Sequence, residues 1–252
     1  MKVFFVGAGP GDPELLSVKA DRLLRRTHIC IYAGSLINPD ILSLLPAGAE
    51  MHDSANLDLQ EIKGLFLEAK NRDIDVVRLH SGDPSIYGAI REQMNELDQL
   101  GIDYEVIPGV SSFQASAAAL KTELTAPEFA QTIILTRTSG RTPMPEEQDL
   151  KILARTHSTL CIFLSTHKLN DVADTLSEHY GSDCPVALVY RASWPDQIIV
   201  RGTLADISTK VSEAGIKKTA MIIVGPALSR DIPPSRLYDP AFSHEYRIGK
   251  ES

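Results

Sequence analysis

A polar turn near the middle of the chain combines residue types that bind small ligands. The run HSGDPSIYG occupies residues 80–88, directly after an apolar, β-branched segment of strand length at 74–79. Gly82 lets the backbone bend, Asp83 offers a carboxylate, and Pro84 keeps Asp83 out of the helical region. Asp83 can therefore either cap a following helix or hold a ligand amine.

The residues after this turn predict a helix. Ile86, Ile90, Met94 and Leu97 fall on one helical face, and Gly101 is placed to end the helix. In an open α/β sheet, ligands bind in the crevice at the carboxyl ends of the strands. The strand–turn–helix pattern therefore predicts that the 80–88 turn lies at a binding site.

A glycine-rich loop near the N-terminus, GAGPGDP at residues 7–13, follows a predicted strand at 2–6. It fails as a dinucleotide-binding fingerprint because its third glycine comes too early and Asp12 would repel phosphates. The second predicted strand, 28–32, carries no acidic residue at its end for a ribose hydroxyl, and no G-K-[ST] follows a glycine loop. The loop therefore disfavours NAD and ATP as ligands.

Two loops carry arginines that could bind an anionic substrate. Arg137 and Arg141 lie among hydroxyl residues after a predicted strand, and Arg191 lies beside Trp194, the only tryptophan. Arginine pairs with carboxylates through two parallel hydrogen bonds, whereas a solvated loop is the alternative for both segments. Trp194 is equally compatible with the core.

No nucleophilic or metal-binding constellation is visible in the spacing. The chain lacks a triad, a paired-carboxylate motif and the histidine spacing of a metal site, so we predict no metal and no catalytic side chain. Cys30, Cys161 and Cys184 form no C-x-x-C pair and are expected to be buried and reduced. These features suit a transfer reaction that needs a bound electrophile, alignment and charge stabilisation.

The predicted elements indicate an α/β protein of two domains. Strands are predicted at 2–6, 28–32, 74–79 and 103–107, and then at 132–136, 160–164, 186–190, 198–200 and 220–224. The pair 186–190 and 198–200 is expected to be antiparallel. We place the domains at 1–121 and 122–228, followed by a loosely ordered tail at 229–252.

Composition limits the possible partners. The 252 residues are 43% hydrophobic, enough for a sizeable core, and the formal net charge is −8. An acidic chain without a basic run argues against nucleic-acid binding. No apolar stretch approaches the roughly 20 residues of a membrane span, and no signal peptide is visible, so we expect a cytoplasmic protein.

Three ordered loops together resemble the tetrapyrrole methylase family: GAGPGDP at 7–13, SGDP at 81–84 and PGVSS at 108–112. The resemblance spans residues 1–228. It implies two α/β domains of the class III methyltransferase type, S-adenosylmethionine in a cleft between them, S-adenosylhomocysteine as product, and a homodimer.

Within that family, the runs YAGSLI (32–37), HSGDPSIYG (80–88) and TRTSGRTPMP (136–145) look like the branch that methylates carbon 11 of precorrin-4 or cobalt-precorrin-4 in cobalamin synthesis. Uroporphyrinogen-III methylases usually carry a second glycine where this chain has Ser81. Another acceptor (a different precorrin, uroporphyrinogen III, ribosomal RNA or a protein) is one alternative, and a non-catalytic ligand-binding module is another.

The resemblance also implies which residues bind ligands. The family's cofactor contacts correspond to Pro10, Gly82, Asp83, Ile86, Ser111, Ser112, Leu164 and Ala192. Leu164 stands where relatives often have methionine, and Ala192 where some have glycine. The peripheral carboxylates of a tetrapyrrole are expected to pair with Arg137, Arg141 and Arg191.

Overall fold

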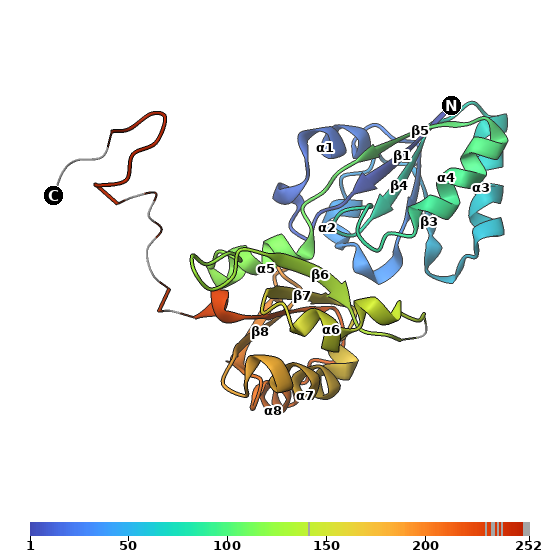
Figure 1. Ribbon diagram of the computed structural model, residues 1–252. Helices are drawn as coiled ribbons and strands as arrows, with labels where there is room; N and C mark the ends of the chain where they lie inside the picture. The colour runs from blue at the N-terminus through green and yellow to red at the C-terminus, as the bar shows by residue number, and fades with distance from the viewer. Residues whose placement is uncertain (141, 230, 233–234, 236, 238, 249–252) are drawn as a thin grey trace. The chain divides into compact units, whose positions relative to one another are not determined.

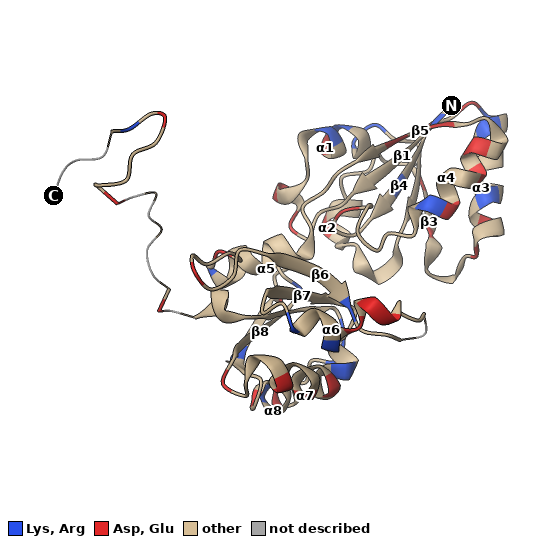
Figure 2. Cartoon of the chain, viewed as in Figure 1, with Lys and Arg blue, Asp and Glu red and all other residues tan. Residues whose placement is uncertain are grey.

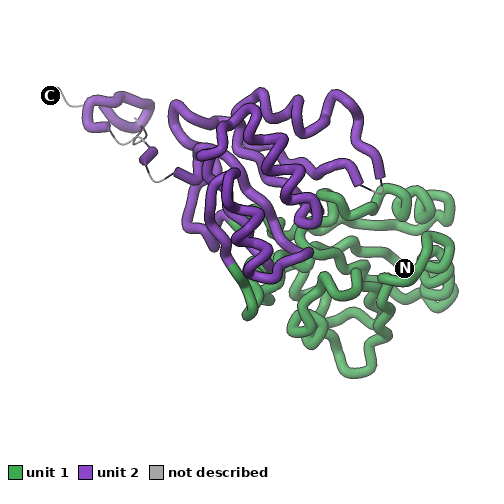
Figure 3. Tube along the Cα trace, turned by 90° about the horizontal axis from the view of Figure 1, so that it is seen from below, with its two compact units in different colours: residues 1–116, 191–198 green, residues 117–190, 199–252 purple. Residues whose placement is uncertain are grey.

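A computed structural model describes residues 1–140, 142–229, 231–232, 235, 237 and 239–248. The chain forms two compact units (Figure 3): unit 1 comprises Met1–Ser116 and Arg191–Ile198, and unit 2 comprises Ala117–Tyr190 and Ile199–Ser252. The chain passes into unit 2 inside a helix, and the domain boundary at 121–122 remains a prediction. Arg141 and part of the expected loose tail, 229–252, lie outside the described residues.

Unit 1 contains a five-stranded parallel sheet with the strand order β3-β2-β4-β1-β5 (Figure 1). Its strands are β1 (Lys2–Gly7), β2 (Ile29–Tyr32), β3 (Glu50–Asp53), β4 (Val76–His80) and β5 (Asp103–Ile107). The four strands predicted for this half are confirmed. β3 was not predicted, because its short sequence EMHD lies at the sheet edge and carries three polar residues.

Helices cover both faces of this sheet. They are α1 (Val18–Leu24), α2 (Pro39–Leu42), α3 (Leu59–Asn71) and α4 (Ile90–Leu100), and α5 (Ser112–Leu120) crosses into unit 2. Phe66 of α3 and Leu97 of α4 share one core cluster with Phe5, whereas Leu24 of α1 shares the opposite cluster with Leu79. Short 3-10 turns, Pro13–Leu15, Gly34–Leu36 and Ser54–Asn56, complete the connections. Alternate residues of a strand thus pack on opposite helical layers.

The side toward which the chain winds changes between the adjacent parallel strands β4 and β1. The chain leaves β1 toward β2 on one side and leaves β4 toward β5 on the other. The carboxyl ends of adjacent parallel strands with opposite connections form the switch point at which open α/β sheets bind ligands. The glycine loop and the 80–88 turn follow these two strands.

The helix after the 80–88 turn begins at Ile90, so the prediction of a start near Ile86 is wrong. Tyr87 and Ala89 adopt left-handed φ values of 56° and 48°, which interrupt the helix, and Ala89 is its N-cap residue. A Cβ atom on Gly88 would lie 2.1 Å from the Pro84 carbonyl oxygen. The turn therefore folds back on itself before α4 starts. The predicted end is confirmed, since Gly101 caps α4 with φ 60°.

Unit 2 contains a mixed five-stranded sheet with the order β6-β7-β10-β8-β9. Its strands are β6 (Ile133–Arg137), β7 (Thr159–Phe163), β8 (Pro185–Tyr190), β9 (Ile198–Thr203) and β10 (Ala220–Val224). β6 pairs with β7 in parallel, whereas β10 is antiparallel to β7 and β8. β8 and β9 are neighbours in this sheet, and the seven-residue connection 191–197 is shorter than a parallel crossover needs, so the antiparallel pairing stays the prediction.

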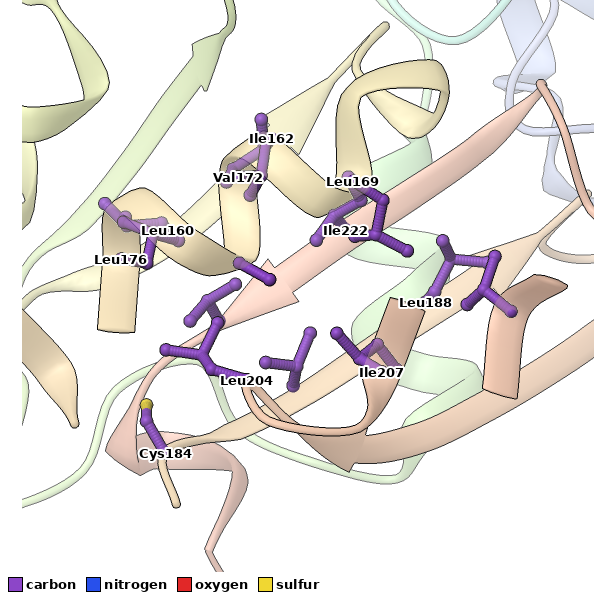
Figure 4. Packing of buried hydrophobic residues seen from close by; sticks show 14 of the residues in the cluster. Leu160, Ile162, Leu169, Val172, Leu176, Cys184, Leu188, Leu204, Ile207 and Ile222 are labelled. Atoms are coloured by element: carbon purple, nitrogen blue, oxygen red, sulfur yellow. The ribbon is translucent and has the colours of Figure 1, made fainter. Parts of the chain in front are cut away.

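Three helices pack on this second sheet: α6 (Leu150–Ala154), α7 (Leu169–Tyr180) and α8 (Ile207–Glu213). 3-10 turns occur at Glu146–Gln148, Thr166–Lys168 and Pro226–Leu228. Figure 4 shows Leu160, Leu176, Leu188 and Ile222 in the shared core, all fully buried. α6 was not predicted, because five residues are too few to show a helical period.

Charged side chains of both signs are interspersed along α3 and α4, while the strands are largely uncharged (Figure 2). Ion pairs such as Lys63–Glu96, at 2.6 Å, join these two helices. Within the described ranges, no helix is both long and apolar enough to span a bilayer.

Candidate functional site

Three loops meet at the carboxyl edge of the unit 1 sheet. Gly9 and Gly82 form an antiparallel bridge: the Gly82 amide donates to the Gly9 carbonyl at 2.7 Å, and the Gly9 amide donates back at 3.2 Å. The Ala8 amide donates to the His80 carbonyl at 2.7 Å. The glycine loop and the 80–88 turn are thus joined backbone to backbone.

Glycine is required where these loops touch. A Cβ atom on Gly7 would lie 2.6 Å from the Gly109 nitrogen, and one on Gly109 would lie 2.3 Å from the Gly82 oxygen. Gly82 itself adopts φ 63°, and its added Cβ would lie 3.7 Å from Ser111 Cα, at ordinary contact distance. The loops after β1, β4 and β5 therefore form one cluster, which we call the strand-end cluster (residues 7–12, 80–85 and 108–112).

Asp83 ties two of these loops together. Its Oδ2 accepts a 3.0 Å hydrogen bond from the Gly109 amide, and its Oδ1 accepts from the amide (2.8 Å) and the hydroxyl of Ser85. Asp83 does not cap α4, whose N-cap residue is Ala89, so the first alternative drawn from the sequence is wrong. A contact between Asp83 and a ligand stays a prediction.

Ser111 and Ser112 form the start of α5. The Ser111 amide donates to Gln114 Oε1 at 2.9 Å, and the Ser111 carbonyl accepts from the Gln114 amide at 3.1 Å, which satisfies polar groups at this helix end. Ser111 is buried. Ile86 is half-buried in the turn, and its amide donates to the Asp83 carbonyl at 3.2 Å.

A segment distant in sequence completes unit 1. The Trp194 indole N–H donates to the Pro10 carbonyl at 2.8 Å, and the Asp12 amide donates to Ser193 Oγ at 3.0 Å. Ala192 is buried in the same segment. The structure thus brings Ala192 into the same unit as Pro10. Sequence reasoning did not assign Ser193 or Trp194 to the site, although a lone tryptophan after a strand was a signal.

Two buried polar side chains project from β4, the strand that leads into the cluster. Arg78 donates from Nε to Gln93 Oε1 at 2.9 Å and from Nη1 to the Ile31 carbonyl at 3.3 Å, and burial lowers its pKa to about 10. Burial, aided by Arg78, lowers the pKa of His80 to about 3, so its ring is neutral at pH 7. His80 Nε2 is buried and has no hydrogen-bond partner within the described structure. Its ring lies 6.0 Å from the Phe5 ring.

The two described arginines that were predicted to bind the substrate, Arg137 and Arg191, bond within their own loops. Arg137 donates from Nη1 to the carbonyls of Thr138 (3.2 Å) and Thr142 (3.1 Å), and from Nη2 to that of Pro143 (3.0 Å). Arg191 donates from Nη1 to Asp196 Oδ2 at 2.6 Å, and its guanidinium lies 4.7 Å from the Trp194 ring centroid. Arg137 therefore shapes its loop, and substrate binding by both arginines stays a prediction.

Leu164 and Arg137 lie at one edge of the unit 2 sheet. Arg137 is in register with Phe163, and the Thr138 amide donates to Ser165 Oγ at 2.9 Å. Leu164 has φ 55° and a relative exposure of 66%, unusually open for leucine. A cavity of about 150 Å³ adjoins the loop and is lined by Arg137, Thr138, Ser139, Met144, Asp149, Leu150, Lys168, Asp171, Val172 and Thr175.

The strand-end cluster offers backbone groups and small side chains for binding. In the described part of the chain no three His, Cys, Asp or Glu residues are grouped to hold a metal ion. Such an arrangement can bind and align a reactive small molecule.

Comparisons with known proteins point to one family. The family model described as Tetrapyrrole (Corrin/Porphyrin) Methylases matches residues 2–208. The chain is 53% identical to a cobalt-precorrin-4 C(11)-methyltransferase of Methanocaldococcus jannaschii, covering 98% of this chain and 96% of the relative. It is 49% identical to a precorrin-4 C(11)-methyltransferase of Pseudomonas aeruginosa, covering 99% and 100%.

Solved structures show the same likeness. A cobalt precorrin-4 methyltransferase structure superimposes with a TM-score of 0.88 at 43% identity, covering 90% of this chain and 96% of that one. A uroporphyrin-III C-methyltransferase of Thermus thermophilus, in complex with S-adenosylhomocysteine, gives a TM-score of 0.76 at 29% identity, covering 90% and 99%.

Proposed function

Because the chain belongs to the tetrapyrrole (corrin/porphyrin) methylase family, we propose that it transfers a methyl group from S-adenosylmethionine to carbon 11 of a precorrin-4-type macrocycle in cobalamin synthesis. One observation carries the choice of reaction. Identity to precorrin-4 C(11)-methyltransferases is 43–53% over nearly the full length, against 29% for the uroporphyrin-III methyltransferase. The fold is shared by both groups, so the difference in identity, rather than the fold, supports the carbon-11 reaction.

The strand-end cluster fits the cofactor. Gly82 carries no side chain beside the start of α5, where an added Cβ would lie 3.7 Å from Ser111 Cα, and Ser111 and Ser112 are small. Pro10, Gly82, Asp83, Ile86, Ser111, Ser112 and Ala192 of unit 1 would hold it, and a contact with Leu164 stays a prediction. When bound, S-adenosylmethionine supplies the methyl group as an activated sulfonium.

The chain's own residues would act by positioning. Asp83 holds the loops after β4 and β5 together through Gly109, which keeps the backbone groups of both loops in place. No side chain of the cluster is assigned as a base, so alignment supplies the rate enhancement. Arg137, Arg141 and Arg191 would pair with the acetate and propionate groups of the macrocycle and so set which carbon meets the methyl group.

Two measurements test the proposal. Calorimetry should detect S-adenosylhomocysteine binding and no NAD(H) binding; the reverse result would overturn the cofactor assignment. Anaerobic transfer assays should then use precorrin-4, cobalt-precorrin-4 and uroporphyrinogen III, with mass spectrometry for the added methyl group and NMR for its position. Methylation of uroporphyrinogen III alone would overturn the substrate assignment. Both precorrin forms are included because the relatives act on one or the other.

We also infer a homodimer in the cytoplasm. Exposed apolar side chains on both edge strands of the unit 2 sheet, Ile133 and Leu135 on β6 and Ile199 on β9, support association between copies. All three cysteines are free and buried, which suits a reducing compartment. Sedimentation should give the mass of two chains, and Leu135→Glu should weaken association. A wild-type monomer at micromolar concentration would contradict the dimer.

A further inference from the structure

Residues 191–198 belong to unit 1, although in sequence they connect two strands of the unit 2 sheet. This segment carries Trp194, the only tryptophan in the chain. Ala192 in the same segment is a predicted cofactor contact, but the function proposed above assigns no role to Trp194. Its contacts with the glycine loop indicate one.

Trp194 and its neighbour Ser193 hold three successive residues of the glycine loop. The indole N–H donates to the Pro10 carbonyl at 2.8 Å, and Ser193 Oγ accepts from the Asp12 amide at 3.0 Å. Between them, Gly11 packs directly against the indole: a Cβ atom there would lie 2.1 Å from both Cδ1 and Nε1. The turn at residues 10–12 therefore has its shape imposed by the 191–198 segment.

A buried amide holds the same turn from another side. The Gly11 carbonyl accepts a 2.9 Å hydrogen bond from Nδ2 of Asn38, whose relative exposure is 5%. Consecutive residues 10, 11 and 12 thus each bond to a side chain distant in sequence. Gly11 is buried and its two neighbours are half-buried, so side chains rather than bulk water satisfy these three backbone groups.

The 191–198 segment is itself held in a conformation that side chains disfavour. Arg191 and Ser193 have left-handed φ values of 44° and 71°. The strain is sustained by hydrogen bonds inside the segment, from the Ser193 amide to Gln197 Oε1 (2.8 Å) and from the Trp194 amide to the Arg191 carbonyl (3.0 Å). Backbone strain that the surroundings maintain in this way clusters at functional sites.

We propose that Trp194 is a positioning residue for methyl transfer: it fixes the turn at residues 10–12, where Pro10 is one of eight predicted cofactor contacts, in the shape that aligns the methyl group for transfer. The inference rests on the proposed function. The Gly9–Gly82 bridge and the Asp83–Gly109 bond hold the rest of the strand-end cluster without Trp194. Loss of the indole should therefore disturb the turn, and with it the transfer step, while most cofactor contacts persist.

Two variants of Trp194 separate its contributions. Trp194→Ala should lower kcat/KM for the tetrapyrrole at least tenfold, with S-adenosylhomocysteine affinity within threefold of wild type. Trp194→Phe keeps the ring over Gly11 and loses only the N–H bond, so it should recover part of the loss. Phe129→Ala, which removes an aromatic side chain 54% exposed elsewhere, is the matched control and should leave both quantities unchanged.

Gly11→Ala tests the contact with the tryptophan retained. The added methyl group should displace the indole, shifting the emission of this single tryptophan to longer wavelength, and should lower transfer as Trp194→Ala does. Wild-type kcat/KM in Trp194→Ala, or an equal loss of cofactor affinity and transfer, would overturn the inference. An unshifted emission in Gly11→Ala would overturn it as well, even if Trp194→Ala fails to fold. A wild-type protein that methylates no tetrapyrrole would instead refute the proposed function.

Discussion

Replacing Gly109 by alanine tests whether the three strand-end loops are in backbone contact. The added Cβ would lie 2.3 Å from the Gly82 oxygen and 2.9 Å from the Gly7 Cα atom. Both are backbone atoms, so no side-chain rotation can relieve the clash. Separating the loops would also stretch the 3.0 Å hydrogen bond from the Gly109 amide to Asp83.

The size of the effect follows from these two losses. Overpacking a close-packed site costs about 1–3 kcal/mol, and a hydrogen bond to a charged group contributes about 1.5–3 kcal/mol. Reduced freedom of the unfolded chain offsets about 0.4–1 kcal/mol. We therefore expect Gly109→Ala to lower the free energy of unfolding by roughly 1.5–5.5 kcal/mol, against the 5–15 kcal/mol typical of a folded protein.

Urea unfolding and calorimetry with S-adenosylhomocysteine measure the two consequences. The variant should remain folded in buffer, unfold at lower urea, and bind the ligand at least tenfold more weakly. Gly64→Ala is the control, because Gly64 lies within α3 with no atom within 4 Å of the added Cβ, and should stabilise the protein by about 0.5–1 kcal/mol. If Gly109→Ala matched this control in stability and bound the ligand like wild type, the close contact between the loops would be refuted.

Three further predictions concern single side chains. Gly82→Val places a branched residue at φ 63°, which costs about 1–2 kcal/mol, and should abolish S-adenosylhomocysteine binding by calorimetry; wild-type affinity would reduce Gly82 to a turn residue. Arg137→Ala should lower kcat/KM by one to two decades, about 1.5–3 kcal/mol, at unchanged cofactor affinity. Arg137→Lys should recover little of the lost kcat/KM because lysine lacks the planar guanidinium fork. Wild-type kcat/KM in both Arg137 variants would contradict substrate binding by Arg137. His80 has its pKa lowered from 6.5 to about 3, so the unfolded chain takes up the proton first as pH falls. Its contribution to the free energy of unfolding, at most about 4–5 kcal/mol, is present above pH 6.5 and is lost progressively toward pH 3. In urea unfolding, His80→Phe should reduce the difference in the free energy of unfolding between pH 7 and pH 4. If that difference is unchanged, groups other than His80 cause it.

The sequence alone determined the local elements and the order of the loops. β5 and β10 begin and end at the residues predicted for them, and Gly101 ends α4 as its position predicts. The spacing of apolar residues and the tendency of glycine to end an element both act over a few residues, so they can be recognised in the sequence without knowledge of the fold. Edge strand β3 and the five-residue helix α6 were not predicted from the sequence, because neither carries a full period of apolar residues.

Only the tertiary structure decided which loops meet and what each polar group does. The order β4-β1-β5 brings Gly7, Gly82 and Gly109 together, and Trp194 bonds to Pro10 across 184 residues of chain. From the sequence, Asp83 could equally have capped a helix or held an amine. It bonds to Gly109 because the loops after β4 and β5 end at the same edge of the sheet, on either side of β1. These partners depend on strand order and register, which result from burying every apolar face at once, and no local pattern of residues contains that information.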